Sequence, residues 1–394
     1  MITTTVHSAA VVAAAAASIT TVDRSLSTSQ DTVSSTYDAT SVICVILICL
    51  ITCSMILATL IGNALVILAV MLVRKLKQPC NYLLISLAVA DFSVGFIVMP
   101  LALVELFTGK WVLGVVFCRI WTSSDQTLCT ASIINLCMIN VDRYLAVSRP
   151  LRYAAQRTKK RIFCYVVIVW IVAFIVSISP LVVWPAPPVE NICQVNQNAV
   201  YQIYATIISF YLPTLIMVIL FIKMWRAAKR LADQDRLAKK SVIGVETHTS
   251  NRRSAHRPST ILQKIPLVHN GKVQEKGEGK ARKTLGVIMS IYIICWLPFF
   301  ILALLKPQGV MPPRWLDHVI LWLGYSNSLM NPLIYCKYNR EFRVPFREML
   351  CCRFSTLQTV MRKESFTSRF GPSRTQEYPF PAKNIGALQI VDTL

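Results

Sequence analysis

The sequence predicts an all-α membrane protein, a seven-transmembrane helix bundle with its N-terminus outside and a short amphipathic eighth helix. The first reason is composition: 54% of the 394 residues are hydrophobic and only 15% are charged, which is too apolar for an ordinary soluble domain. The second is a series of runs with few or no charges, each near or above the ~20 residues that a helix needs to cross a bilayer of ~30 Å. These runs lie at 42–73, 80–104, 120–141, 163–189, 199–222, 284–305 and 318–336.

The orientation of the bundle follows from its basic residues, since lysine and arginine are retained on the cytoplasmic side during insertion. With the N-terminus outside, most of the 41 basic residues are cytoplasmic, and the opposite topology reverses that ratio. The net charge of +22 then belongs mainly to the cytoplasmic loops. Because the charge is divided among several loops, we do not expect nucleic-acid binding. The basic residues on the outer side are Arg24, Lys110, Arg119, Lys306 and Arg314.

The bundle is expected to carry polar segments at both ends. The N-terminal stretch is rich in Ser, Thr, Ala and Val and predicts a disordered extracellular tail; a cleaved signal peptide at "AAVVAAAAAS" is the alternative. The expected organisation is a tail at 1–41, the bundle at 42–338 with a third inner loop at about 228–280, the amphipathic helix at 339–353 and a cytoplasmic tail at 354–394.

Most of the 13 cysteines lie within the spans, where cysteine is a small apolar residue. Only Cys118 and Cys193 fall on the oxidising outer side, where they can form a disulfide; two free thiols are the alternative. Cys351 and Cys352 follow the amphipathic basic stretch "NREFRVPFREML". They are candidates for palmitoylation, with unmodified cytosolic thiols as the other interpretation.

Ionisable residues inside the spans are functional candidates, because each costs about 2.5 to 3.5 kcal/mol on insertion scales. Asp125 lies in "WTSSDQTLCTASI", and no lysine or arginine lies in the outer half of any other span. A ligand cation is therefore its expected partner, and a structural ion pair is the alternative. Arg143 shares the same helix face, about 27 Å further inward. Asp91 is a second buried acid, and it could hold a cation or a water cluster with Ser132, Asn327, Ser328 and Asn331.

Aromatic residues are spaced to surround a ligand cation near Asp125. "CWLPFF" gives Trp296, Phe299 and Phe300 on one helical face, and "WLGYSNS" gives Trp322 and Tyr325 three residues apart. Aromatic faces attract cations through their quadrupole and stack on flat rings. Taken alone, such a stripe is more typical of packing. Beside an unpaired aspartate, it indicates a site for an organic ammonium ion.

These motifs together resemble the rhodopsin-like (class A) G-protein-coupled receptors, and within them the biogenic amine receptors. The resemblance covers roughly residues 42 to 353, and no lysine of the kind that holds retinal in opsins occurs in 318–336. Asp125 together with "WLGYSNS" is typical of the amine branch. The matching motifs are "GN" at 62–63, "LAVAD" ending at Asp91, Cys118, Asp125, "DRY" at 142–144, Trp170, Pro213, "CWLPFF" and "NPLIY" at 331–335.

The resemblance implies a multi-pass plasma-membrane receptor rather than an enzyme. Its implied partners are a small-molecule amine, a heterotrimeric G protein, arrestin, receptor kinases and membrane lipid. The resemblance implies no cofactor other than an allosteric sodium ion. Asp125 would bind the ligand ammonium, and Trp296 would move when an agonist enters. The sodium ligands would be Asp91, Ser132, Asn327 and Ser328, with Asn331 beside them. The remaining ligand contacts would be Cys129, Thr130, Thr206, Ser209, Phe299, Phe300, Trp322 and Tyr325.

The resemblance also implies a coupling site at the inner end of the bundle. Arg143 would be held at rest by Asp142 and Glu278, then released toward the G protein. Two positions depart from the family pattern: Phe221 stands where a tyrosine is usual, and Tyr292 replaces the usual phenylalanine below Trp296. Both departures predict unusual basal activity. The coupling residues would be Asp142, Arg143, Tyr144, Leu151, Glu278, Asn331, Pro332 and Tyr335.

The identity of the amine depends on a few positions. Ala205 stands where catecholamine receptors tend to begin a row of hydroxyls, which leaves Thr206 and Ser209. Ala303, with Cys129 and Thr130, resembles serotonin receptors, whereas "EGKARKTLGVIM" resembles adrenergic receptors and "CRIWTSSD" the histamine type-two receptor. We expect serotonin and stimulatory coupling with rising cyclic AMP. Octopamine, tyramine, dopamine and histamine are the alternatives.

Two other classes of protein use acids inside a membrane. An intramembrane aspartyl protease could use Asp91 and Asp125, but the chain lacks the Gly-x-Gly-Asp context of such enzymes. An ion-coupled amine transporter remains a remote alternative. It would leave "DRY" and the tether between Cys118 and Cys193 without a role, and no internal repeat of the transporter kind is visible.

Overall fold

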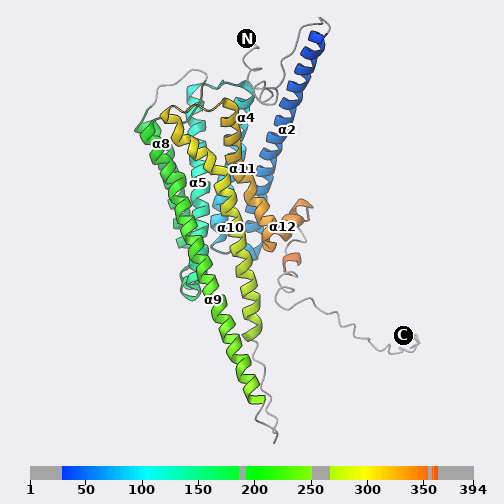
Figure 1. Cartoon of the computed structure of the whole chain (residues 1–394), viewed down its shortest axis with the longest axis vertical. Helices are drawn as coiled ribbons and strands as arrows, with labels where there is room; N and C mark the ends of the chain where they lie inside the picture. The colour runs from blue at the N-terminus through cyan, green and yellow to red at the C-terminus, as the bar shows by residue number, and fades with distance from the viewer. Residues whose placement is uncertain (1–28, 186–191, 251–266, 354–356, 358, 363–394) are drawn as a thin grey trace, which may run out of the picture.

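The computed structural model describes residues 29–185, 192–250, 267–353, 357 and 359–362. Long helices run side by side along its longest axis (Figure 1), and the described residues contain no strand. The helices that cross the bundle are α2 (Ser29–Leu72), α3 with α4 (Asn81–Ser93 and Met99–Thr108), α5 (Gly114–Ser148), α7 (Lys159–Val182), α8 with α9 (Ala199–Thr206 and Leu212–Ser250), α10 (Leu267–Leu305) and α11 (Arg314–Tyr338).

Two of the crossings contain a wider π-helical turn. Val94–Val98 joins α3 to α4, and Ile207–Tyr211 joins α8 to α9. Such a turn inserts an extra residue into the helix and rotates the side chains that follow it, and it is often found at functional sites. The second turn carries Ser209 and Phe210 into the interior, where both are buried.

The seven-helix bundle that the sequence predicts is confirmed, although hydropathy alone identifies only part of it. Among the described residues, 5 helices are long and apolar enough to cross a membrane: Val42–Leu72, Asn81–Thr108, Lys159–Val182, Ala199–Ala227 and Thr284–Gln308. The helices α5 and α11 complete the bundle and are less apolar because they bury polar side chains. These are Thr130, Ser132, Asn135, Asn140 and Asp142 on α5, and Asn327, Ser328 and Asn331 on α11.

The helix α5 lies at the centre of the bundle and packs against α3, α7 and α9, while α11 closes it against α2 and α10. On the outside, α2 and α7 expose large apolar side chains such as Phe163 and Phe174. A surface of this kind is stable against lipid tails rather than against water. The bundle therefore has an apolar perimeter and a largely apolar core in which a set of polar side chains is buried.

The helix ends differ from the expected boundaries. α2 begins at Ser29, within the stretch predicted to be a tail, and α9 and α10 extend to Ser250 and from Leu267, well into the predicted third inner loop. Extending an existing helix adds one hydrogen bond for each residue fixed and avoids the cost of a new nucleus. The predicted third inner loop is therefore largely helical along its described length.

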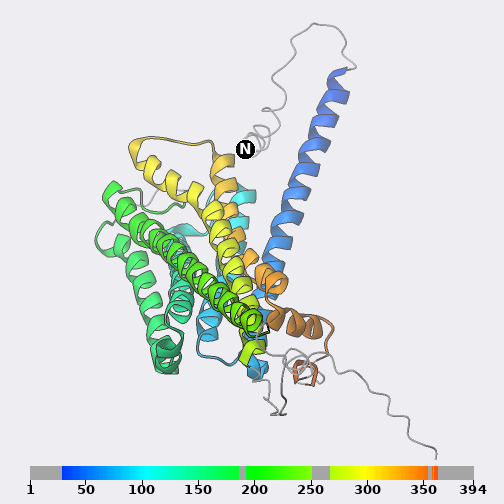
Figure 2. The ribbon, with the colours of Figure 1, turned by 60° about the horizontal axis from the view of Figure 1, so that its bottom comes forward.

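The amphipathic helix after the last span is α12 (Arg340–Leu350), which leaves the inner end of α11 at an angle (Figure 2). It packs against α11 and α2. Phe342, Phe346 and Met349 recur at helical spacing and are buried, whereas Arg343 and Arg347 are exposed. The short α6 (Pro150–Gln156) follows α5 on the same inner side.

Candidate functional site

Asp125 lies in the outer half of α5, about two turns inward of Cys118. The thiol of Cys129 donates a hydrogen bond to Oδ1 of Asp125 over 3.2 Å, and the buried hydroxyl of Tyr325 lies beside the same carboxylate. Within the described ranges, the salt bridges do not include Asp125: they join Lys75 to Glu341, Arg157 to Asp142 and Lys306 to Asp317. The Asp125 carboxylate thus receives no counter-charge from the described side chains.

The predicted aromatic residues form one group on α10 and one on α11, and the two groups approach each other at Gly324 of α11. On α10, the Trp296 ring lies edge-on to Phe299 at 5.7 Å and tilted to Phe300 at 5.8 Å. On α11, Trp322 lies edge-on to Tyr325 at 6.0 Å. Gly324 joins the groups, because a Cβ atom on it would come within 3.0 Å of the Trp296 ring. The aromatic cluster therefore extends from Trp296 to the tyrosine beside Asp125.

Phe210 belongs to the same cluster and was missed in the sequence. Its ring stacks on Phe300 at 4.5 Å and 13°. The π-helical turn between α8 and α9 is what directs Phe210 inward, next to Ser209. A regular helix gives no signal for that turn, so spacing alone could not place Phe210 beside Phe300.

The predicted hydroxyl groups of α8 and of the π-helical turn that follows it have different partners. Thr130 on α5 donates to the Ser209 hydroxyl over 3.0 Å, and both side chains are buried. Thr206 instead donates to the backbone carbonyl of Gln202 over 2.7 Å. Ser209 is thus joined to the helix that carries Asp125, whereas the Thr206 hydroxyl is bonded within its own helix.

Asp91 is the centre of a buried polar cluster inward of Asp125. Ser132 and Ser328 donate to its Oδ1 over 2.8 and 2.9 Å, and Asn331 donates to its Oδ2 over 2.8 Å. The predicted Asn327 lies in the same interior with its side-chain nitrogen buried and without a hydrogen-bond partner. A carboxylate with two hydroxyls suits a hard cation, which prefers oxygen ligands, so these residues fit the implied sodium ion.

Asn135 is a second polar residue that the sequence analysis missed. Both of its side-chain polar atoms are buried and have no hydrogen-bond partner among the described residues. It lies one turn inward of Ser132 on α5, and that spacing was the signal that could have revealed it. Buried amides are usually hydrogen-bonded, so Asn135 and Asn327 offer polar groups that remain available inside the described part of the bundle.

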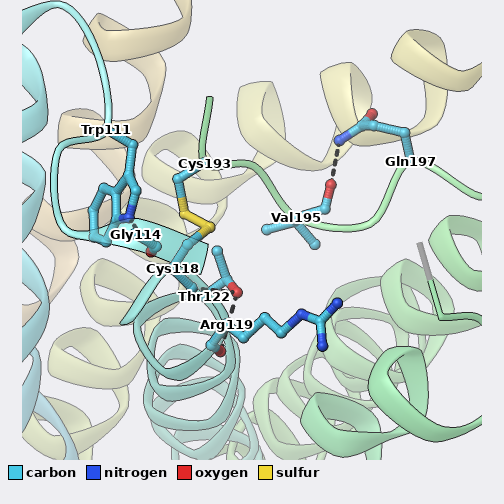
Figure 3. Close-up of a disulfide and its surroundings, with 8 residues drawn as sticks. All are labelled: Trp111, Gly114, Cys118, Arg119, Thr122, Cys193, Val195 and Gln197. Carbon is cyan, nitrogen blue, oxygen red and sulfur yellow. Dashed lines mark hydrogen bonds between the residues drawn. A yellow bond between two sulfur atoms is a disulfide. The ribbon is translucent and has the colours of Figure 1, made fainter. Parts of the chain in front are cut away.

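The predicted disulfide between Cys118 and Cys193 is confirmed, with the two Cα atoms 5.6 Å apart. Figure 3 shows the bridge joining the outer end of α5 to the irregular segment that holds Val195 and Gln197. Trp111 stacks on Trp121 at 5.0 Å and donates to the Gly114 carbonyl over 2.7 Å. The outer end of α5 is therefore fixed from two sides.

At the inner end, the salt bridges of the described residues do not include the expected pair of Asp142 with Arg143, and its role at rest stays a prediction. Asp142 instead forms a salt bridge with Arg157, whose Nε donates over 3.0 Å, and accepts from the Tyr153 hydroxyl over 2.8 Å. The cause is α6, which places Tyr153 and Arg157 four residues apart against the end of α5. Burial, reinforced by the hydrogen bond to Asp142, raises the pKa of the Tyr153 phenol, which keeps it a donor.

The fold and its motifs agree with one family of proteins. Residues 62–335 match the model of the 7 transmembrane receptor (rhodopsin family). The chain belongs to the rhodopsin family. Members of this family are receptors rather than enzymes, and this receptor is a multi-pass plasma-membrane protein, as the sequence predicted.

Curated relatives place the receptor nearer to one branch of that family. It is 37% identical to 5-hydroxytryptamine receptor 1 of Drosophila melanogaster, over 80% of its own length and 66% of that protein. It is 36% identical to 5-hydroxytryptamine receptor 7 of Xenopus laevis over 76% of each chain. It is also 36% identical to human 5-hydroxytryptamine receptor 1B, over 78% of its own length and 86% of that receptor. The expected resemblance to the amine branch is confirmed.

The remaining predicted coupling residues of the receptor lie near its inner end. The Tyr335 hydroxyl is buried and has no hydrogen-bond partner in the described part of the chain. Pro332 packs so closely on Gly62 that a Cβ atom on the glycine would lie 2.9 Å from the proline ring. Tyr144 is half-buried. The side chains of Leu151 and Glu278 lie outside the described residues, so their predicted roles are untested.

Phe221, one of the two departures from the family pattern, packs on the next helix. A Cβ on Gly286 would lie 3.1 Å from its ring, so the absence of a side chain on Gly286 accommodates the phenylalanine. Cys351 and Cys352 are exposed free thiols just after α12. Their predicted palmitoylation stays a prediction.

Proposed function

We propose that the receptor binds a biogenic amine, serotonin in the first place, and signals through a heterotrimeric G protein. The observation that carries this proposal is the carboxylate of Asp125, which has no cationic partner among the described residues and lies beside the aromatic cluster. An ammonium ion supplies the missing charge, and the rings of Trp296, Phe299 and Phe300 exclude water around the pair. The names of the curated relatives support serotonin.

The ring end of the amine reaches toward α5 and the π-helical turn between α8 and α9. A single phenolic hydroxyl needs one partner, and the bonded hydroxyls of Thr130 and Ser209 supply a donor and an acceptor. Thr206 contributes little at rest because its hydroxyl is bonded to its own helix. A ligand with one ring hydroxyl is therefore better matched than a catecholamine with two.

Binding acts on a pre-existing equilibrium between resting and active states, which the ligand shifts by its difference in affinity for the two. Pro298 and Pro332 lie inside α10 and α11, where each removes a backbone hydrogen bond and provides a bend. Movement at these bends opens an inner cavity for the G protein. We propose stimulatory coupling, with rising cyclic AMP.

Other partners follow from the same proposal. Sodium bound at Asp91 favours the resting state. Arrestin and receptor kinases act on the inner surface after activation, and palmitoylation of Cys351 and Cys352 attaches α12 to the lipid.

A panel of amines on cells that express the receptor tests the proposal. Serotonin is expected to raise cyclic AMP at lower concentrations than octopamine, tyramine, dopamine or histamine. A lower effective concentration of octopamine or dopamine contradicts the choice of serotonin, and a fall in cyclic AMP contradicts stimulatory coupling. Uptake of labelled amine by these cells without signalling would indicate the transporter instead.

A further inference from the structure

A cavity of about 600 Å³ lies at the outer end of the bundle, between α5, α7 and the residues that follow Cys193. This volume is typical of sites that hold a drug-sized molecule. Its α5 wall includes Arg119, Ser123 and Gln126, but Asp125 is not part of its lining. The cavity thus lies beside the proposed amine site, and its lining does not include the Asp125 carboxylate.

The described residues that line this cavity carry charge of one sign. Arg119 is the only charged residue among them, and no salt bridge joins it to a described carboxylate. In Figure 3 its side chain extends from α5 away from the disulfide, on the side where Val195 and Gln197 lie. A guanidinium presents five N–H donors and no acceptor. It therefore attracts anions and repels the ammonium group of an amine.

The rest of the lining indicates the size and nature of the anion. Gln126 lies two turns inward of Arg119 on the same face of α5, and its amide can donate a second hydrogen bond. Pro180, Leu181 and Ile192 form apolar parts of the lining. A bare inorganic ion would leave most of this volume unfilled, whereas an anion with an apolar body would bury that body against the wall.

We propose that this cavity binds a small organic carboxylate, with its anionic group on Arg119 and its apolar body against Leu181 and Ile192. A planar carboxylate matches the fork of a guanidinium and forms two parallel hydrogen bonds with it. The same chemistry is present in the carboxylate headgroup of an anionic lipid. We assign the site to the soluble acid, and the experiment distinguishes the two sources.

The proposed site is near enough to Asp125 for the two ligands to influence each other. Arg119 and Asp125 are separated by about 9 Å along the axis of α5. Between them, the Ser123 carbonyl accepts a hydrogen bond from the Ser177 hydroxyl of α7. A bound carboxylate and an ammonium ion on Asp125 then attract each other. We expect each to raise the affinity of the other by the same factor, roughly twofold to tenfold at this separation. This coupling rests on the proposed function, whereas binding of the acid does not.

The experiment uses the full-length receptor in nanodiscs of phosphatidylcholine, a lipid without net charge. Indole-3-acetate is the probe, and indole-3-acetamide is the matched neutral ligand of nearly the same shape. The wild type is expected to bind the acid about tenfold or more tightly than the amide, because only the acid pairs with the guanidinium. Equal affinities for acid and amide, or no binding of the acid below 10 mM, overturn the proposal.

Variants locate the binding site. Arg119→Gln should lower the affinity for the acid to that for the amide, and Arg119→Lys should restore part of the difference. Lys110→Gln is the matched control, since it removes an exposed outer charge that does not line the cavity. Arg119→Gln with acid affinity within twofold of wild type contradicts the site. If Arg119→Gln does not fold, the affinities for acid and amide are compared in Arg119→Lys and wild type. Arg119→Lys should then prefer the acid less strongly than wild type does, and an unchanged preference contradicts the site.

Two further arms separate the possible failures. Asp125→Asn should bind indole-3-acetate at least as tightly as wild type, because it leaves Arg119 unchanged and removes a nearby negative charge. This result does not depend on whether the amine proposal is right. In discs that also contain phosphatidylserine, the affinity for the acid should be unchanged. If phosphatidylserine lowers the affinity for the acid more than threefold in wild type but not in Arg119→Gln, the cavity binds the lipid headgroup. That result overturns the assignment to a soluble acid.

Discussion

The hydroxyl groups of Tyr292 and Thr214 lie 2.9 Å apart and form a hydrogen bond between α10 and α9. Tyr292 is completely buried, about one turn inward of Trp296. Tyr292 is one of the two departures from the family pattern named in the sequence analysis, and its hydroxyl is the group that makes this bond possible. It joins α9 and α10, whose inner halves we expect to separate in the proposed opening toward a G protein.

Removing this hydrogen bond is expected to raise basal signalling. Tyr292→Phe deletes one oxygen and keeps the ring, and a hydrogen bond of this kind contributes about 0.5 to 1.5 kcal/mol. The equilibrium should therefore shift two- to tenfold toward the active state. Basal cyclic AMP at equal surface expression measures the effect. Thr214→Val should act in the same direction, and the double variant should add little; fully additive effects would show that the pair does not act together.

Replacing Asp125 tests the ligand counter-charge. Asp125→Asn keeps the shape of the side chain and removes its charge, and loss of one partner of a buried pair costs about 3 to 5 kcal/mol. Amine affinity should fall about a hundredfold or more, while surface expression is retained. Asp317→Asn, an outer acid paired with Lys306 at 2.8 Å, is the matched control. Radioligand binding within threefold of wild type in Asp125→Asn contradicts the role.

Sodium dependence tests the polar cluster around Asp91. If the carboxylate and the hydroxyls of Ser132 and Ser328 hold sodium at rest, raising sodium should weaken agonist binding in the wild type. Asp91→Asn should abolish this effect and impair signalling, because an amide lacks the charge that holds the cation. Potassium at the same ionic strength is the control for screening. A sodium response that persists in Asp91→Asn refutes the site.

Arg157 competes with Arg143 for the carboxylate of Asp142. In Arg157→Gln the salt bridge of Arg157 is lost, which leaves Asp142 free to pair with the neighbouring Arg143. Basal signalling and agonist potency should both fall, because Arg143 is then retained by its own helix. Lys159→Gln, which removes an exposed charge at the start of α7, should have no effect. Raised basal signalling in Arg157→Gln would contradict the competition.

Features that depend on composition and spacing along one helix could be predicted from the sequence. The seven spans, the disulfide and the aromatic faces follow from such patterns, and Ser132, Ser328 and Asn331 do converge on Asp91. The pairs Thr130–Ser209 and Phe210–Phe300 could not be predicted, because they depend on the π-helical turn between α8 and α9 and on helix rotation. The partner of Asp142 depends on the fold of a loop, which a motif of three residues does not contain.

The bridge between Cys118 and Cys193 also determines where movement can occur. Only residues 194–198 separate Cys193 from the start of α8, and hydrogen bonds shorten that segment further, from Gln202 to the Asn196 carbonyl over 2.6 Å and from the Tyr201 amide to Asn198 over 3.1 Å. The outer end of α8 is therefore a fixed pivot. From this fixed end, α8, the π-helical turn and α9 continue as one long helical segment to Ser250. A small rotation at the outer end therefore displaces the cytoplasmic end of α9 the most.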